Sequence, residues 1–404
     1  MRRRGATVAL SALLCLFRAQ HVLAQAVAIS VQVADAAPLQ TLDDKYLGFN
    51  IDSGSLYHNI QLGDAIFRQL AKNLVPGQLR VGGSASDSLW FVPTAPDGAT
   101  QGPSPDPLAP NAAAAAAPGF SGYTPEVTIM NSDMWRSLTQ FATGAQLDLL
   151  FDVNAVDFRT PSGAWNPAGN ATGLLEATAA ENLYVAAWEL GNEPDLWGKH
   201  FGMNVGGAQL ADDLRALQAL AASHPGMSTA VSGPSLATFN ATLVASFLQQ
   251  WGATGGGALS FTAHAYPLGP PTYAPASSRP SCSVANYLNL TRVSNVSSYL
   301  GQFSAAVAQY GSTTATRMVL EETASNSLGG CIGYSDRFIS GMAAACHCDA
   351  KQPQQPQQPL TRLNSCCSAG FYFTNLLGVV GESGWQQVWL ARAKADVAPH
   401  VAQA

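Results

Sequence analysis

The sequence predicts an α/β fold in which eight parallel strands alternate with helices and close into a TIM (β/α)8 barrel. Short apolar runs rich in Val, Leu, Phe and Trp recur at intervals that leave room for a helix, a pattern typical of parallel strands joined by helical crossovers. Amphipathic stretches fill several of these intervals, most clearly from Ala208 to Ala222, where Leu210, Leu214 and Leu217 share one face. Eight strand and helix units of this kind form a TIM barrel.

The predicted strands follow one another through residues 41–393, and a short tail at 394–404 comes after them. In chain order they are Tyr46 to Asp52, Gln78 to Val81, Leu147 to Asn154, Tyr184 to Leu190, Thr229 to Gly233, Leu259 to Tyr266, Arg317 to Glu321 and Gln386 to Ala391. Two stretches interrupt the pattern. Residues 94–125 are rich in Pro, Ala and Gly, and residues 346–367 contain the low-complexity run QPQQPQQP. We expect both to be insertions that contribute nothing to a core.

Residues 1–24 have the pattern of a secretory signal peptide. Three arginines precede the apolar run Ala6 to Phe17, and small residues follow where a signal peptidase cuts. A membrane anchor is the alternative, but this run is shorter than the roughly 20 residues that a spanning helix needs. We therefore expect a secreted, extracellular protein, with a lysosomal, vacuolar or cell-surface location as the alternatives. Residues 25–40 then contain a strand, Ala26 to Val33, ahead of the barrel. Four glycosylation sequons agree with secretion, at Asn170, Asn240, Asn289 and Asn295.

The charge of the chain excludes some partners. Removal of residues 1–24 takes away four of the 20 Lys and Arg residues and none of the 26 Asp and Glu residues, so the formal net charge moves from −6 to −10. Nucleic acids and strongly sulfated polymers are bound through clustered Lys and Arg, which this chain lacks. We expect no nucleic-acid partner. The oligomeric state does not follow from the sequence.

The cysteines indicate an oxidising compartment. Six of them follow the signal peptide, at Cys282, Cys331, Cys346, Cys348, Cys366 and Cys367. Such cysteines form disulfides in secreted proteins, although no pairing follows from the sequence. The group around His347 also resembles a zinc site, but a secreted chain with Gln and Pro repeats between the cysteines favours disulfides or free thiols. We predict no metal and no cofactor.

Two predicted strands end in acidic residues. The fourth ends in WELGNEP, which places Asn192 and Glu193 directly after the strand, and the seventh ends in MVLEET, which contains Glu321 and Glu322. In a TIM barrel the chemistry occurs at the carboxyl ends of the strands. Two carboxylates on that rim are what glycosidic bond cleavage requires, because one protonates the leaving oxygen and the other attacks the sugar or activates water. Any single glutamate at a strand end is as often an ordinary surface acid.

Several motifs, in this order and spacing, give the chain a resemblance to the heparanase and β-glucuronidase group, glycoside hydrolase family 79. The motifs are LRVGGSASD (79 to 87), NAVDFRTPSGAWN (154 to 166), WELGNEPD (188 to 195), VGGAQLADDLRAL (205 to 217), SGPSL (232 to 236), FTAHAYPLG (261 to 269), YLNLTRVSN (287 to 295) and LEETASNSLGGCIGYSDRF (320 to 338). WELGNEP alone indicates only a superfamily of barrel glycosidases, whereas the set is specific to the family.

The resemblance implies the roles of the two acids. Glu193 matches the family's acid/base, and Glu322 matches its nucleophile because Thr323 stands where the family places Ser or Thr. Glu321 stands where relatives usually have glycine, and strand alternation predicts that its side chain points away from that of Glu322. Asn192 matches the residue that hydrogen-bonds the sugar 2-hydroxyl. The implied mechanism is retaining, with the two carboxyls about 5 to 5.5 Å apart.

Other positions match residues that line the family's substrate cleft. His264 and Tyr266 would lie beside the nucleophile, although a structural pair under the barrel mouth is the alternative for them. Asp52 and Ser84 match sugar contacts, and Gly329 and Gly330 match backbone donors to a uronate carboxylate. Relatives also carry a C-terminal β-sandwich to which the N-terminal strand contributes, and here that domain is expected to be truncated or missing.

These observations predict a secreted retaining glycosidase that cleaves β-glucuronosyl linkages in a glycan or proteoglycan substrate. Residues 94–125 contain no Lys or Arg, so a weakly charged glycan is favoured over heparan sulfate. Peripheral association with a membrane or cell wall is compatible with this function. The alternatives are another β-glycosidase of the same superfamily, of the xylanase or β-glucosidase type, and a catalytically inactive glycan-binding protein.

Overall fold

The computed structural model describes residues 44–57, 60–95, 100–101, 127–266, 290–311, 316–323 and 387–391. The chain divides into two compact units, Met1–Leu39 and Gln40–Ala404, and all of the described residues belong to the second. The predicted signal peptide, the N-terminal strand, the six cysteines, the insertion at 346–367, the tail, Gly329 and Gly330 lie outside the described residues.

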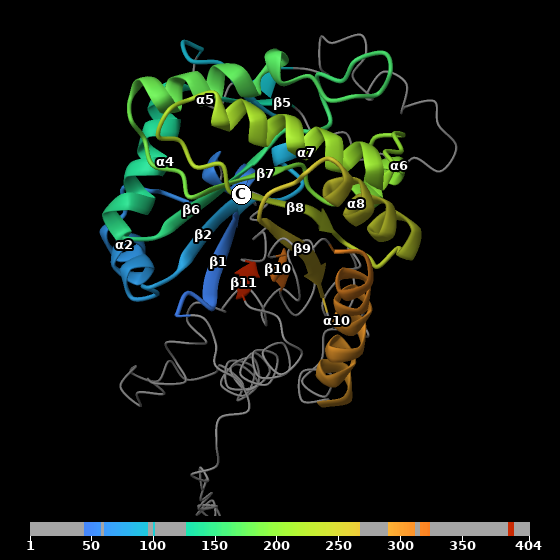
Figure 1. Cartoon of the computed structure of the whole chain (residues 1–404). Helices are drawn as coiled ribbons and strands as arrows, with labels where there is room; N and C mark the ends of the chain where they lie inside the picture. The colour runs from blue at the N-terminus through green and yellow to red at the C-terminus, as the bar shows by residue number, and fades with distance from the viewer. Residues whose placement is uncertain are drawn as a thin grey trace, which may run out of the picture. The chain divides into compact units, whose positions relative to one another are not determined.

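Eight parallel strands form a closed barrel, as predicted (Figure 1). They are β1 (Leu47–Asp52), β2 (Gln78–Gly82), β6 (Asp148–Val153), β7 (Ala187–Leu190), β8 (Val231–Leu236), β9 (Leu259–Ala265), β10 (Thr316–Thr323) and β11 (Gln387–Ala391). The order around the barrel is β1-β11-β10-β9-β8-β7-β6-β2, and β2 closes it by pairing with β1. Each of these strands overlaps one of the eight expected from the sequence.

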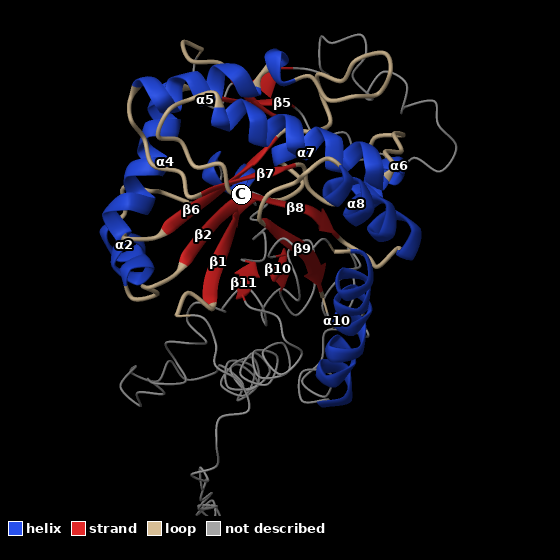
Figure 2. Cartoon of the chain, viewed as in Figure 1, coloured by secondary structure: helices blue, strands red, loops and turns tan. Residues whose placement is uncertain are grey.

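Helices lie along the outside of the strands (Figure 2). They are α2 (Ala65–Lys72), α4 (Ser132–Ala145), α5 (Ala171–Ala180), α6 (Trp197–His200), α7 (Gly207–Ala222), α8 (Ala241–Ala253) and α10 (Leu290–Tyr310). Three of them begin at a side chain that accepts a hydrogen bond from the first turn, namely Asp64, Asn131 and Asn240. Among the described residues, no helix combines the length and the apolar character needed to cross a membrane.

A small second sheet was not predicted. Its strands are β3 (Leu89–Phe91), β5 (Val127–Met130) and β4 (Thr100–Gln101), in the order β3-β5-β4. Strands of two to four residues are too short to show a periodic pattern in the sequence. β4 lies within residues 94–125, so the described part of this expected insertion contributes a strand to the sheet.

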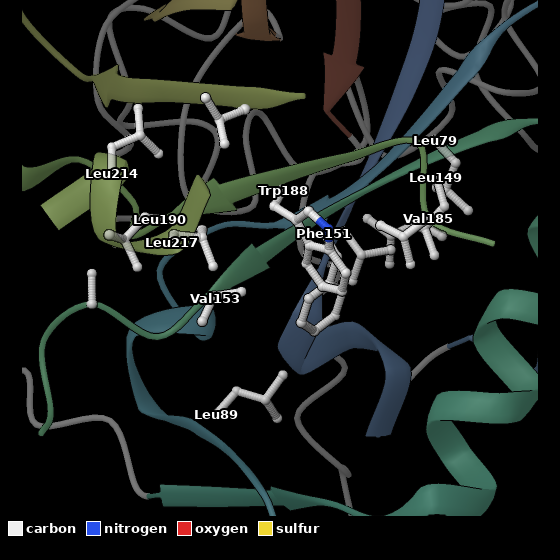
Figure 3. Packing of buried hydrophobic residues seen from close by; sticks show 14 of the residues in the cluster. Leu79, Leu89, Leu149, Phe151, Val153, Val185, Trp188, Leu190, Leu214 and Leu217 are labelled. Carbon is white, nitrogen blue, oxygen red and sulfur yellow. The ribbon is translucent and has the colours of Figure 1, made fainter. Parts of the chain in front are cut away.

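The hydrophobic core lies between the barrel and its helices. Side chains from alternate strand positions fill this layer, including Phe151 and Trp188 (Figure 3). The indole of Trp135 on α4 packs edge-on against Phe151, with ring centroids 4.7 Å apart. Burial of such large aromatic surfaces holds the helices on the sheet.

The other strand positions point into the barrel, whose interior is unusually polar. Branched apolar side chains usually fill this space. Here Leu150 and Val319 form a small apolar cluster. Above it lie fully buried charged residues, among them Arg80, Asp152 and Glu189. This charged layer supports the candidate active site.

Candidate active site

Glu193 lies in a sharp turn after β7 that its own residue type does not favour. Its backbone is left-handed, with φ of 51° and ψ of 54°, and its amide donates to the carbonyl oxygen of Ser235 at 3.0 Å. Gly191 precedes it with φ of 75°, and a Cβ there would lie 2.6 Å from Cβ of Ala155. Left-handed backbone at a residue other than glycine is uncommon and often marks a functional site. The turn directs the Glu193 carboxyl toward the barrel mouth, where its side chain is 15% exposed.

Asp87 anchors this turn from the neighbouring loop. Its carboxylate accepts hydrogen bonds from the amide of Asn192 at 3.2 Å and from the indole nitrogen of Trp197 at 3.0 Å. The same indole nitrogen lies 2.8 Å from the carbonyl oxygen of Asn192. Burial raises the pKa of Asp87 well above its ordinary value, against the effect of these two hydrogen bonds. The backbone of this turn is therefore held by Asp87 at Asn192 and by Ser235 at Glu193.

Glu322 enters the site from β10, through an irregularity in that strand. Leu320 pairs with Ala263 and Glu322 pairs with His264, so Glu321 is an extra residue in the ladder. The Glu322 carboxylate accepts a hydrogen bond from the Tyr266 hydroxyl at 2.5 Å and another from Arg80 at 3.0 Å. Its side chain is 17% exposed. Two donors on an accessible carboxylate suit a nucleophile.

The prediction that Glu321 points away from Glu322 is wrong. Both carboxyls turn toward the same two cations: Glu321 lies 3.7 Å from Nε of Arg80 and 3.5 Å from Nε2 of His264. Strand alternation assumes a regular ladder, and the extra residue breaks that alternation. Glu321 is completely buried, whereas Glu322 reaches the surface of the site. Of the two, only Glu322 is accessible to a sugar.

His264 joins the two candidate catalytic residues. Its Nδ1 lies 2.9 Å from Oε1 of Glu193, and its Nε2 lies 3.9 Å from Oε2 of Glu322. Its Nε2 also lies 3.0 Å from the Ser235 hydroxyl. Burial lowers the pKa of His264, but the hydrogen bond to Glu193 and the nearby carboxyls of Glu321 and Glu322 outweigh it and raise the pKa to about 10. His264 is thus fully buried, as a structural residue under the barrel mouth would be, and it also contacts Glu193 and Glu322.

Arg80 organises the buried layer and is not among the residues predicted from the sequence. Its guanidinium holds Glu189 through two hydrogen bonds of 2.6 and 2.7 Å. It also donates to Asn192 Oδ1 at 3.1 Å and to the Ser235 hydroxyl at 3.3 Å. The guanidinium of Arg80 therefore contacts Asn192, next to Glu193, as well as Glu322. A charged residue inside an apolar strand, as in LRVG, was the available signal.

Ser84 and Asp52 lie on the same rim but contribute differently. The Ser84 hydroxyl lies 3.5 Å from Nδ2 of Asn192, so the structure brings these two predicted residues together. Asp52 ends β1, and its carboxylate accepts a hydrogen bond from the amide of Gly54 at 2.9 Å. A Cβ on Gly83 would lie 2.8 Å from that carboxylate, so Asp52 packs closely against the backbone after β2. In the described part of the chain, no group of three or more His, Cys, Asp or Glu could hold a metal ion.

The arrangement can carry out acid, base and nucleophilic chemistry without further groups. Two accessible carboxyls come from β7 and β10, each held by its own hydrogen bonds, and they contact the two nitrogens of one imidazole. Oε1 of Glu193 is held by His264, whereas Glu322 is held at Oε1 by Tyr266 and at Oε2 by Arg80. This is the set of groups that glycosidic bond cleavage uses.

Comparison with known proteins places the chain among the glycoside hydrolases. A family model described as glycosyl hydrolase family 79, N-terminal domain, matches residues 46–341. The chain is 28% identical to heparanase of Mus musculus over 225 residues, which cover 49% of this chain and 41% of that protein. It is 22% identical to hyaluronoglucuronidase of Hirudo nipponia over 341 residues, covering 78% of this chain and 63% of the other. The chain thus spans less than two thirds of either relative.

A solved structure supports the same fold. The 4-O-α-L-rhamnosyl-β-D-glucuronidase of Fusarium oxysporum superposes with a TM-score of 0.53 at 15% identity, covering 87% of this chain and 63% of that one. At this identity the likeness concerns the fold alone. The family model covers well over half of the chain, and the chain therefore belongs to glycosyl hydrolase family 79.

Proposed function

We propose that this protein is a secreted retaining glycosidase that hydrolyses β-glucuronosyl linkages in glycans, with Glu193 as acid/base and Glu322 as nucleophile. The observation that carries the proposal is the contact of both carboxyls with His264 at the carboxyl ends of β7 and β10. Neither carboxyl is sealed from solvent, because their side chains are 15% and 17% exposed. Buried Glu189 and Glu321, which lie deeper in the barrel, cannot reach a sugar.

The proposed reaction has two steps. In the first, a carboxylate oxygen of Glu322 bonds to the anomeric carbon while the glycosidic C–O bond breaks and Glu193 gives its proton to the leaving oxygen. In the second, Glu193 takes a proton from water, whose oxygen displaces Glu322 from the anomeric carbon. Tyr266 and Arg80 hold Glu322 in place for the attack. Asn192 is expected to hydrogen-bond the sugar 2-hydroxyl.

The proposed substrate class rests on the relatives and on charge. Proteins named heparanase and hyaluronoglucuronidase match this chain, and the second name specifies a glucuronide. The chain is acidic, with a formal net charge of −6. An acidic surface repels a densely sulfated polymer. We therefore favour a weakly charged or unsulfated glycan.

Azide rescue with an aryl β-glucuronide tests the assignment. Glu322→Ala should abolish turnover, and azide should restore part of it by attacking the anomeric carbon from the vacated side, which yields the α-glucuronosyl azide. Glu193→Ala should still form the glycosyl-enzyme from an activated aryl substrate, and azide should then displace Glu322 to give the β-azide. The product configuration, read by NMR, distinguishes the two roles.

Two controls complete this experiment. Glu321→Ala should show no azide rescue, because a completely buried residue leaves no space open to the sugar. Glu176→Ala, on the exposed face of α5, should keep full activity. An α-azide from Glu321→Ala would reassign the nucleophile. Glycan binding by the unmodified protein with no turnover of any glycoside would instead establish an inactive binding protein.

A further inference from the structure

Glu321 is a buried carboxylate that the proposed reaction does not use. It is completely buried, and the Ser232 hydroxyl donates a hydrogen bond to its Oε1 at 3.1 Å. Its other oxygen has no hydrogen bond but lies 3.5 Å from Nε2 of His264. Burial raises the pKa of Glu321, yet Arg80 and His264 outweigh this effect and lower the pKa to about 2. The two neighbouring cations therefore favour the ionised form of Glu321 inside the barrel.

Arg80 also holds a second buried acid, Glu189, whose pKa burial and the nearby Glu321 raise to about 8. Arg80 binds Glu189 through two hydrogen bonds of 2.6 and 2.7 Å, whereas its Nε lies 3.7 Å from Glu321. A bidentate guanidinium and carboxylate pair is the strongest form of this interaction. Glu321 therefore lies between two cations, Arg80 and His264, and Arg80 is shared with Glu189.

The carboxyls around His264 favour its protonated form. The carboxyl of Glu193 faces Nδ1 at 2.9 Å, and those of Glu321 and Glu322 face Nε2 at 3.5 and 3.9 Å. Arg80 is the nearby cation, and the Ser235 hydroxyl, which accepts from it at 3.3 Å, separates it from Nε2. Tyr266, two residues along, donates to Glu322 and not to the imidazole. Three carboxyls around one buried imidazole stabilise a second proton on it.

We propose that Glu321 is a positioning residue that keeps His264 doubly protonated and thereby fixes which oxygen of Glu193 carries the transferable proton. This inference rests on the proposed role of Glu193 as acid/base. With a proton on each nitrogen, His264 can only donate to Oε1 of Glu193, so the acidic proton of Glu193 is confined to Oε2. When Oε2 gives that proton to the leaving oxygen, the new carboxylate keeps the Nδ1 hydrogen bond to its Oε1. A neutral imidazole with its proton on Nε2 would instead accept a hydrogen bond at Nδ1 from the protonated carboxyl of Glu193, and the acidic proton would then point away from the substrate.

NMR of the histidine ring nitrogens in the full chain tests the proposal without relying on activity. The His264 signals are identified by their loss in His264→Gln. In the unmodified protein, both ring nitrogens should carry protons from pH 5 to 8. In Glu321→Gln, which keeps the shape but removes the charge, the midpoint for loss of the second proton should fall by about one to three pH units.

Kinetics supply a second readout. For a glucuronide with a poor leaving group, kcat/KM of Glu321→Gln should begin to decline at a lower pH than kcat/KM of the unmodified enzyme. At pH 8 the variant's kcat/KM should be about tenfold lower. An activated aryl glucuronide needs little protonation, so its kcat/KM should change much less. A purely structural role would lower both substrates together. Glu176→Gln, the same change of charge on the exposed face of α5, should alter neither readout.

Two outcomes would overturn the proposal. One is a His264 imidazole that carries a single proton at pH 7 in the unmodified protein, a result that needs no folded variant. The other is a Glu321→Gln protein in which the His264 titration is unchanged. In either case, turnover and azide rescue at Glu322 would still support the proposed function. Absence of turnover in the unmodified protein would remove that function and leave the protonation result intact.

Discussion

Replacement of Arg80 by methionine should destabilise the protein more than any surface change, because the guanidinium is the main cation of the buried layer. Methionine keeps the apolar stem but leaves Glu189 and Glu321 without their ion pair. Arg80 is the largest influence that opposes burial at Glu321, whose pKa lies at about 2 instead of 4.5. That difference corresponds to about 3 kcal/mol. Breaking a buried ion pair from one side costs about 3 to 5 kcal/mol, so we expect a loss in that range at pH 7.

The loss should depend on pH, with a sign that follows from these charges. In the unmodified protein the folded-state pKa of Glu321 is depressed, so its contribution is present above pH 4.5 and is lost as the pH falls toward about 2. In Arg80→Met the main influence that opposes burial is gone, so the folded-state pKa of Glu321 rises. The folded variant then binds a proton at Glu321 more tightly than the unfolded chain does, and its stability falls as the pH rises. The gap between the two proteins should therefore widen from pH 4 to pH 7.

Differential scanning calorimetry at pH 4 and pH 7 measures this gap. We expect the melting temperature to fall by roughly 5 °C at pH 7 and by less at pH 4. Arg136→Met is the matched control, because Arg136 forms the same two-pronged pair with Glu181 on the surface. Its melting temperature should hardly change, since exposed ion pairs contribute little. Equal melting temperatures for Arg80→Met and the unmodified protein at pH 7, or a gap independent of pH, would refute the reasoning.

Two further predictions concern the turn and the surface. Gly191→Ala should lower both activity and melting temperature, because its Cβ would meet Ala155 at 2.6 Å in a left-handed backbone, whereas Gly173→Ala in open space on α5 should be neutral or stabilising by up to about 1 kcal/mol. Activity assays and calorimetry on both variants check this, and an active, stable Gly191→Ala protein would contradict it. The second prediction is weak retention on a heparin column, with elution at low salt, because the acidic surface has little to offer a sulfated polymer. Retention that resists high salt would contradict the proposed substrate class.

The barrel could be predicted because its signal is local. Apolar runs such as Leu147 to Asn154 predict buried strands without information from the rest of the chain, and the observed β6 falls within that run. The small sheet could not be predicted, because β4 has two residues and becomes a strand only by pairing with β5. Short segments of this kind take their conformation from a partner that the sequence pattern does not reveal.

The sequence nominates residues of the candidate site but does not predict the contacts between them. Glu193 and Glu322 follow from strand ends and from the family motifs. The inward turn of Glu321 depends on one extra residue in the β10 ladder, and nothing in LEET distinguishes a regular strand from a bulged one. Arg80 could have been singled out as a charge within an apolar run. Its partners come from β7, β8 and β10, and no spacing along the chain shows that they meet.

The backbone at Glu193 has a consequence for how this chain can change over time. Glutamate is poorly suited to a left-handed conformation, and asparagine or glycine would relieve about 1 kcal/mol of strain there. Folding alone would therefore let the position drift away from glutamate. A lineage that no longer cleaved glycans would be expected to lose this residue early, while the barrel around it persisted. The local backbone therefore gives no reason for a glutamate at position 193, and this supports the proposed role of Glu193 as acid/base.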